Sequence, residues 1–315
     1  IGAALAEANM AQLMYDYVLI PGDEAVATVE GARAIVAGHG RRAPGAIRAR
    51  LDFLLGEVLI EWGNVERGYP LLEQAVRTLR ASTESQTQLG ELSLELGSAL
   101  TEVGRHAEAD RELRAAFEMI KRESADDPRR MAIGLRYLAE NLRMQGRFDE
   151  AEAALQSALD LEGTRDSSGG SALQRRIVVS DLALVKLERG DPASALQLLS
   201  QYDDRAEFDR YAGFGADVEL VRAECWCVVG RVREGLPVLE KFAAKLAERG
   251  YVHDSSTARL RALAGLCALK TGDRKRAVEL SELARQAFNA QPGVSPYFKA
   301  PLVKLEQSLR GHATG

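Results

Sequence analysis

Cysteine, aromatic residues and long apolar runs are scarce in this sequence of 315 residues. Aromatic residues make up 6% of the chain, and no apolar run reaches the roughly 18 residues that a membrane-spanning helix needs. The N-terminus also lacks the basic-then-apolar pattern of a signal peptide. The formal net charge of −5 argues against a nucleic-acid-binding surface over the whole chain. We therefore expect neither membrane contact nor nucleic-acid contact by this segment.

The three cysteines, Cys225, Cys227 and Cys267, form no CxxC pair and have no paired histidines nearby. Metal binding is therefore not expected, and unpaired thiols favour a reducing compartment. Cys225 and Cys267 are 42 residues apart. We expect these two to pack against each other as buried thiols, and a disulfide between them is the alternative.

The chain begins at Ile1 rather than at methionine, so we expect it to be a piece of a longer protein. The missing N-terminal part would then hold an effector domain or a membrane anchor. The predicted location is the cytoplasm. The alternative is the extracytoplasmic part of a membrane-anchored protein.

No catalytic constellation is visible. The four histidines fall in turns or near the C-terminus, and the sequence has no HExxH motif, no nucleophile elbow and no phosphate-binding loop. We therefore predict a protein that is not an enzyme and that has no catalytic residues, no cofactor and no metal.

Residues 131–161 give the clearest structural signal. Leu135, Leu138 and Leu142 recur at helical spacing, which places one apolar stripe on one helix face. Gly146 follows, and glycine tolerates the left-handed backbone that commonly ends a helix. The apolar spacing resumes beyond it. The segment therefore predicts two amphipathic helices joined by a glycine turn.

The same arrangement recurs along the chain at intervals of 40 to 44 residues. A small residue lies seven positions before the turn glycine in all units but the first, and alanine or glycine lies five positions after it in every unit. Such spacing lets two helices pack closely on either side of each turn. The aligned glycines are Gly22, Gly63, Gly104, Gly146, Gly190, Gly230 and Gly272.

This pattern resembles the tetratricopeptide repeat, most clearly in LGSALTEVGRHAEADRELRAAF at 96–117 and LAENLRMQGRFDEAEAALQSAL at 138–159. The resemblance implies an all-α fold, a right-handed superhelical solenoid of antiparallel helix pairs with a concave groove. The period near 42 exceeds the family's usual repeat of about 34 residues. It is similar to the long-repeat subclass of kinesin light chains and many bacterial signalling proteins.

We predict a single solenoid over 1–315 with about seven units. A divergent N-terminal unit occupies 1–39, six units fill 48–290 and a C-terminal capping helix spans 295–310. In the first unit, Pro21 and Gly22 are expected to form the turn and Asp23 to cap the next helix. The polar segment 163–171 is predicted to be a disordered loop, and 208–216 an irregular connection that packs.

The resemblance implies that the first helix of each pair lines the groove. The predicted partner-binding residues are mixed in charge and polarity. They are Arg50, Phe53, Glu57, Leu94, Ser98, Thr101, Ile133, Arg136, Glu140, Arg143, Met144, Ile177, Ser180 and Leu184.

Arg136 and Arg143 lie two turns apart and could fork one carboxylate of a ligand. The alternative is an ion-pair lattice within the helix, with Glu140. The family's clamp for a C-terminal carboxylate is not expected, because Glu57, Glu140 and equivalent residues stand where that clamp has asparagine.

The predicted function is a protein-interaction scaffold that binds a peptide or helix of a partner protein in the groove. The alternative is a C-terminal regulatory or sensor array of a larger bacterial signalling protein, either a serine/threonine kinase or a transcription regulator.

Overall fold

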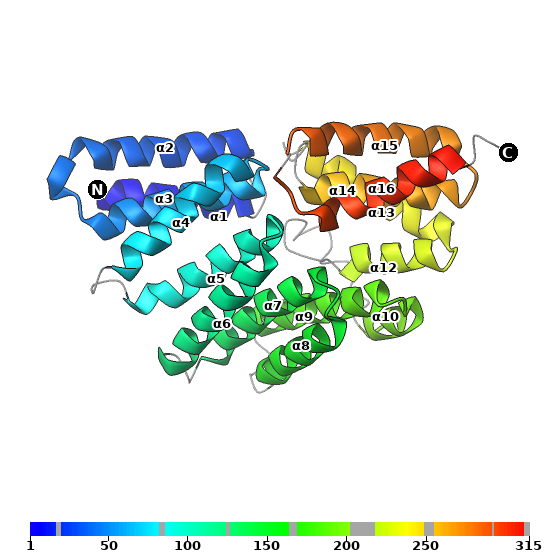
Figure 1. Cartoon of the computed structure of the whole chain (residues 1–315), viewed down its shortest axis with the longest axis horizontal. Coiled ribbons are helices and arrows are strands. Elements are labelled where there is room, and N and C mark those ends of the chain that lie inside the picture. The colour runs from blue at the N-terminus through cyan, green and yellow to red at the C-terminus, as the bar shows by residue number, and fades with distance from the viewer. Residues whose placement is uncertain are drawn as a thin grey trace. The chain divides into compact units, whose positions relative to one another are not determined.

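The computed structural model describes residues 1–16, 20–81, 86–123, 127–163, 169–201, 218–248, 255–291 and 293–311. Over these ranges the secondary structure is helical, and no strand is present (Figure 1). The predicted all-α fold is confirmed. The chain divides into two compact units, Ile1–Asn141 and Leu142–Gly315. The prediction of one solenoid over 1–315 stays a prediction.

The first unit consists of helix pairs in which the second helix of one pair also packs against the first helix of the next. The first helices α1, α3 and α5 contact one another in turn. The helices are α1 (Gly2–Asp16), α2 (Gly22–Gly38), α3 (Gly45–Glu61), α4 (Val65–Arg80), α5 (Gln86–Glu102), α6 (His106–Glu123) and most of α7 (Pro128–Met144), with a short 3-10 helix η1 (Gly40–Arg42) after α2.

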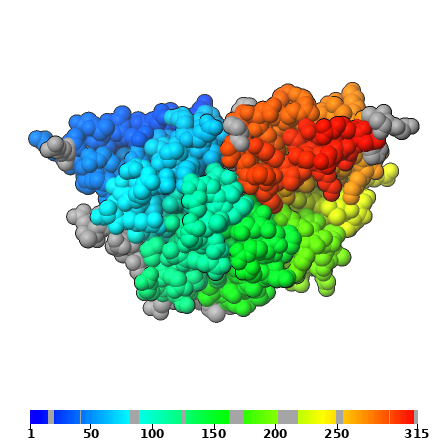
Figure 2. All heavy atoms as spheres, in the orientation of Figure 1, coloured from blue at the N-terminus to red at the C-terminus, as the bar shows by residue number. Residues whose placement is uncertain are grey.

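The second unit begins in the last turn of α7 and repeats this arrangement. Its first helices α9, α12 and α14 also contact one another in turn. The final helix α16 packs on α14 and α15, and Figure 2 shows α15 and α16 side by side on the surface of this unit. The helices are α8 (Phe148–Gly163), α9 (Gly169–Glu188), α10 (Pro192–Leu199), α12 (Val218–Val228), α13 (Val232–Glu248), α14 (Ser255–Leu269), α15 (Arg274–Asn289) and α16 (Pro296–Gly311).

Six of the seven predicted turn glycines end a first helix with a left-handed backbone. At Gly63, φ is +90°, and the next residue donates its N–H to the Leu59 carbonyl at 2.6 Å, which closes a Schellman-type turn. The same bond recurs at every one of these turns. The residue that follows the glycine donates its N–H to the carbonyl of the residue four positions before the glycine. The other five are Gly104, Gly146, Gly190, Gly230 and Gly272, with φ from +74° to +95°.

The prediction for Gly22 is wrong. Gly22 is the first residue of α2, and Pro21 before it is extended, with no side chain capping the helix. A Cβ on Gly22 would lie 2.3 Å from Cδ1 of Trp62. Gly22 therefore provides room for the Trp62 indole rather than a left-handed turn. Asp23 lies in the first turn of α2 and is not its cap.

Small residues mark the closest approach of paired helices. A Cβ on Gly68 in α4 would lie 2.6 Å from the Gly56 carbonyl oxygen in α3. In the second unit, a Cβ on Gly235 in α13 would lie 2.6 Å from the Ala223 carbonyl oxygen in α12. In these two pairs the helices thus meet backbone to backbone, as the spacing of small residues predicts.

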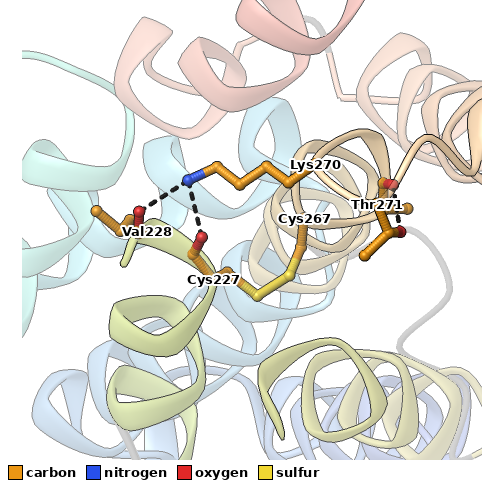
Figure 3. Close-up of a disulfide and its surroundings, with 6 residues drawn as sticks. Cys227, Val228, Cys267, Lys270 and Thr271 are labelled. Carbon is orange, nitrogen blue, oxygen red and sulfur yellow. Dashed lines mark hydrogen bonds between the residues drawn. A yellow bond between two sulfur atoms is a disulfide. The ribbon is translucent and has the colours of Figure 1, made fainter. Parts of the chain in front are cut away.

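The cysteine prediction is also wrong. Cys227, near the end of α12, forms a disulfide with Cys267 in α14, with 5.3 Å between the Cα atoms (Figure 3). Cys225 is the free, buried thiol, and burial raises its pKa to about 12. Residues 225 and 267 occupy equivalent positions in successive repeats. Equivalent side chains on neighbouring helices point the same way rather than towards each other.

Lys270 accompanies the disulfide. Its Nζ donates to the carbonyl oxygens of Cys227 and Val228, both at 2.8 Å (Figure 3). These carbonyls lie in the last turn of α12, where a cation complements the helix dipole. Two successive repeats are therefore joined covalently and through a helix cap at the same place.

The predicted irregular connections fall largely outside the described residues. Segment 208–216 lies wholly outside them. Of segment 163–171, Gly163 is the last residue of α8, and 169–171 form the start of α9, so these positions are helical rather than part of a loop.

Candidate ligand-binding face

All fourteen predicted partner-binding residues lie on the first helices α3, α5, α7 and α9, but their exposure divides them evenly. The buried residues contribute to packing. The partly exposed residues remain the predicted contact surface. Buried are Phe53, Leu94, Thr101, Arg143, Ile177, Ser180 and Leu184, and partly exposed are Arg50, Glu57, Ser98, Ile133, Arg136, Glu140 and Met144.

Polar contacts link the first helices within the first unit. Gln12 on α1 donates to Glu57 on α3 at 2.5 Å, and the Tyr137 hydroxyl on α7 donates to Glu95 on α5 at 2.9 Å. Burial, reinforced by the Glu95 charge, holds the pKa of Tyr137 well above its ordinary value. The hydroxyl therefore stays protonated and keeps donating to Glu95 at neutral pH.

A second cross-link in this unit uses the histidine that follows a turn. Nδ1 of His106 at the start of α6 lies 2.9 Å from Oδ1 of the buried Asn141 on α7. The Asn141 amide nitrogen donates back to the His106 carbonyl oxygen at 3.2 Å. This reciprocal pair joins successive repeats, so His106 has a structural role.

The second unit holds a denser polar group, which we call the inner cluster: Arg143 of α7, Glu188 of α9, Arg259 of α14 and Tyr297 of α16. Oε1 of Glu188 accepts from Arg143 at 2.9 Å, from Arg259 at 3.3 Å and from the Tyr297 hydroxyl. Arg143 also donates to the Tyr297 hydroxyl. One carboxylate oxygen thus collects donors from three different helices.

Both arginines of the inner cluster stack on one aromatic ring. The guanidinium carbons of Arg143 and Arg259 lie 5.1 Å and 4.7 Å from the centre of the Tyr297 ring, within cation–π range. Burial raises the pKa of Tyr297 to about 12, despite the opposing charges of Arg143 and Arg259. Tyr297 therefore acts as a neutral donor and as a platform for two cations.

Glu224 of α12 lies beside the inner cluster. It occupies the position one step after the small residue Ala223, where the clamp described above has asparagine. Burial raises the pKa of the Glu224 carboxyl, and the charge of Arg259 partly offsets this. Together with the inner cluster, Glu224 places charged residues on four consecutive first helices.

The predicted Arg136–Arg143 fork on a ligand carboxylate stays a prediction. Arg143 is only 8% exposed and is committed to Glu188 and Tyr297, so its guanidinium is held within the second unit. Arg136 lies over the Tyr137 ring at 5.7 Å. The two guanidinium groups therefore have different surroundings, although they share one helix.

Of the four inner-cluster residues, only Arg143 is among the predicted partner-binding residues. Arg259 lies six positions before the small residue Gly265, one of the steps that the family resemblance assigns to the groove, so its signal was present. Tyr297 follows the last repeat and had no such signal. It joins Arg143 across 154 positions of sequence.

Metal sites and membrane-spanning helices are absent from the described ranges. Among these residues, no group of three or more His, Cys, Asp or Glu side chains could hold a metal ion. Of the helices in those ranges, none is long and apolar enough to cross a membrane.

Comparison with known proteins identifies the repeat. Residues 88–162 match the family model described as tetratricopeptide repeat. These residues carry tetratricopeptide repeats. The match covers the third and fourth predicted units, from which the resemblance was drawn. A search of curated proteins finds no match to this sequence.

Solved structures extend the likeness in fold to nearly the whole chain. The Rap conjugation gene regulator of plasmid pLS20, in complex with the Phr* peptide, is 18% identical with a TM-score of 0.65, over 92% of this chain and 73% of that one. A Rap protein complexed with competence and sporulation factor is 12% identical with a TM-score of 0.63, over 98% and 86%. The apo form of RapI is 13% identical with a TM-score of 0.53, over 85% and 70%. At such identities, the likeness shows the helical repeat fold alone.

Proposed function

We propose that this protein is a binding module that takes up a peptide segment of a partner protein along its first helices. The observation that carries the proposal is the concentration of charged side chains on the first helices of the second unit, joined by hydrogen bonds to one another and to Tyr297 of α16. A prepared polar surface of this kind loses little side-chain entropy when a ligand binds.

Two of the structures with a similar fold support this proposal, because each was solved with a bound peptide or factor. The partly exposed members of the predicted surface add aliphatic and charged side chains suited to an extended or helical peptide. Binding rather than catalysis is the proposed activity. The groove itself, and the presence of an effector domain before Ile1, remain predictions, as does the alternative of a regulatory or sensor array within a larger bacterial signalling protein.

The test is selection of short random peptides displayed on phage against the full chain, followed by affinity measurement with a labelled synthetic peptide. Ser98→Arg in the first unit and Met144→Arg in the second place a large cation among the partly exposed predicted residues. Ser157→Arg, on the exposed surface of α8, is the matched control. We expect at least one of the two first-helix variants to weaken binding about tenfold, and the control to bind like the wild type.

Failure to select any peptide would contradict the proposal, as would equal affinity in all three variants. The charge reversal of Arg143 is not a suitable test, because it would place a second carboxylate beside the partly buried Glu188 and would disturb folding.

The proposed location now depends on the disulfide. Unpaired thiols favoured the cytoplasm, but the structure pairs Cys227 with Cys267, and structural disulfides belong mainly to oxidising compartments. We therefore favour the alternative, an extracytoplasmic location. Thiol alkylation of the protein, taken without reduction from the cells that make it, should label Cys225 alone after denaturation. Labelling of all three cysteines would support the cytoplasm.

A further inference from the structure

The guanidinium of Arg259 has hydrogen-bonding capacity that the protein does not use. It carries five N–H donors. Among the residues that the structure describes, its one hydrogen-bond partner is Oε1 of Glu188, at a long 3.3 Å. Its guanidinium carbon lies over the Tyr297 ring, 4.7 Å from the ring centre, and the side chain is 16% exposed. Arg259 therefore retains N–H groups for a ligand.

Glu224 offers the complementary acceptor. Within the described part of the chain, no residue donates a hydrogen bond to the Glu224 carboxylate or forms an ion pair with it. Glu224 is half-buried and lies among charged neighbours. Arg259 is the strongest of these charges, followed by Glu188 and Arg143. Glu224 nevertheless lies beyond the 4.0 Å at which it would pair with the Arg259 guanidinium. Among the described residues, a donor and an acceptor thus lie near each other without an ion pair between them.

The charge balance favours a neutral ligand group. The two arginines are matched by two glutamates, so basic and acidic groups are equal in number. An anion on Arg259 would add negative charge beside Glu188 and Glu224, and a cation on Glu224 would add positive charge beside Arg143 and Arg259. Either would leave one partly buried charge uncompensated, which is costly. A neutral ligand group that has both a hydrogen-bond acceptor and a hydrogen-bond donor can bond to Arg259 and to Glu224 without changing the net charge.

An extended peptide presents such a pair of groups. The N–H and C=O of one residue point to the same side of an extended chain, as in the hydrogen-bonded pairs of antiparallel strands. We propose that Arg259 and Glu224 form a subsite for the main chain of one peptide residue, with Arg259 donating to its carbonyl oxygen and Glu224 accepting from its N–H. This inference rests on the proposed peptide-binding function and specifies its chemistry.

The experiment uses a peptide obtained by the selection described above and measures its Kd with the full chain by fluorescence anisotropy. Glu224→Met removes the acceptor at similar size, whereas Glu224→Gln keeps an acceptor oxygen. Glu279→Met, on the exposed side of α15, is the matched control. A parallel peptide series replaces one backbone amide at a time with an ester, which removes a single N–H. Circular dichroism melting verifies that each variant is folded.

We expect Glu224→Met to raise Kd about tenfold, and Glu224→Gln and Glu279→Met to stay within about threefold of the wild type. One of the ester-containing peptides should bind the wild type about tenfold more weakly than the all-amide peptide does. The same ester should cause no further loss of binding to Glu224→Met. Wild-type affinity in Glu224→Met, or in Arg259→Met, which removes the donor, would overturn the subsite but leave the proposed function standing. The absence of any selected peptide would overturn both.

Discussion

The lack of a Cβ atom at Gly68 allows the paired helices α3 and α4 to approach closely. At Gly68 an added methyl group would meet the Gly56 carbonyl oxygen at 2.6 Å, a backbone atom that cannot turn aside. We predict that Gly68→Ala lowers the free energy of unfolding by about 1–3 kcal/mol through overpacking. Urea denaturation followed by circular dichroism measures this difference.

Gly31→Ala is the matched control, because Gly31 is an exposed residue within α2 and an added Cβ would have no atom within 4 Å. There the same substitution should stabilise the protein by about 0.5–1 kcal/mol through helix propensity. An unchanged stability of Gly68→Ala would mean that α3 and α4 do not pack as closely as the structure shows.

Glu224 is expected to make stability depend on pH with an unusual sign. Burial raises its pKa in the folded protein above the ordinary 4.5, so the folded state retains a proton that the unfolded chain has released. Stability from this group is therefore lost as pH rises from about 4.5 through the folded pKa. We predict that Glu224→Gln is more stable than the wild type at pH 7.5, and that this advantage disappears at or below pH 4.

Glu152 is expected to make stability depend on pH with the opposite sign. A hydrogen bond from Lys186 lowers the pKa of the Glu152 carboxyl, so the ionised form is stabilised in the folded state. Glu152→Gln should therefore be less stable than the wild type at pH 7.5, and the difference should shrink as pH falls below 4.5. If both variants shifted in the same direction at pH 7.5, the argument for Glu224 would fail.

At the scale of helices, the disulfide joins α12 to α14, the first helices of two successive repeats. It closes a loop with a sequence separation of 40, for which chain-entropy arguments give about 2–4 kcal/mol of stabilisation. We predict that the double variant Cys227→Ala, Cys267→Ala loses about this much stability in urea denaturation. A reducing agent should lower the stability of the wild type and leave that of the double variant unchanged.

The same scale shows which features could be read from the sequence. A left-handed helix end is a local requirement that glycine meets, so Gly63, Gly104 and the later turn glycines were predictable one repeat at a time. Gly22 has the same spacing but does not form a left-handed helix end. A small residue is required at this position because the Trp62 side chain, some 40 positions away in sequence, lies against it. The pairing of Cys227 rather than Cys225 depends on which way each side chain points between helices. Repeat alignment does not contain that information.

The candidate site could be predicted only in part for a related reason. Repeat positions identified the first helices as the binding surface, and Arg143 and Glu188 lie at those positions. Their surroundings were not predictable, because Arg143 bonds to Tyr297, which is distant in sequence and lies outside the repeats. Contacts between several repeats and a helix outside them form only when the repeats stack. The sequence pattern of a single repeat does not predict such contacts.

For the whole molecule, two compact units built from repeats imply that stability is local. Each helix pair rests mainly on its neighbours, so a perturbation should spread over adjacent pairs rather than over the chain. Reduction of the disulfide offers a clean perturbation of the second unit. We predict that it accelerates amide hydrogen exchange in α12 and α14, and in α13 between them, while exchange in α3 and α4 of the first unit stays unchanged.

Peptide-resolved hydrogen exchange with mass spectrometry, with and without a reducing agent, measures this pattern directly. The double variant Cys227→Ala, Cys267→Ala provides the control, since its exchange should already match that of the reduced wild type. Gly68→Ala should give the complementary pattern, with faster exchange in α3 and α4 and none of the change in α12 and α14. Uniform acceleration along the chain in either experiment would show that the repeats unfold as one cooperative block and would contradict local stability.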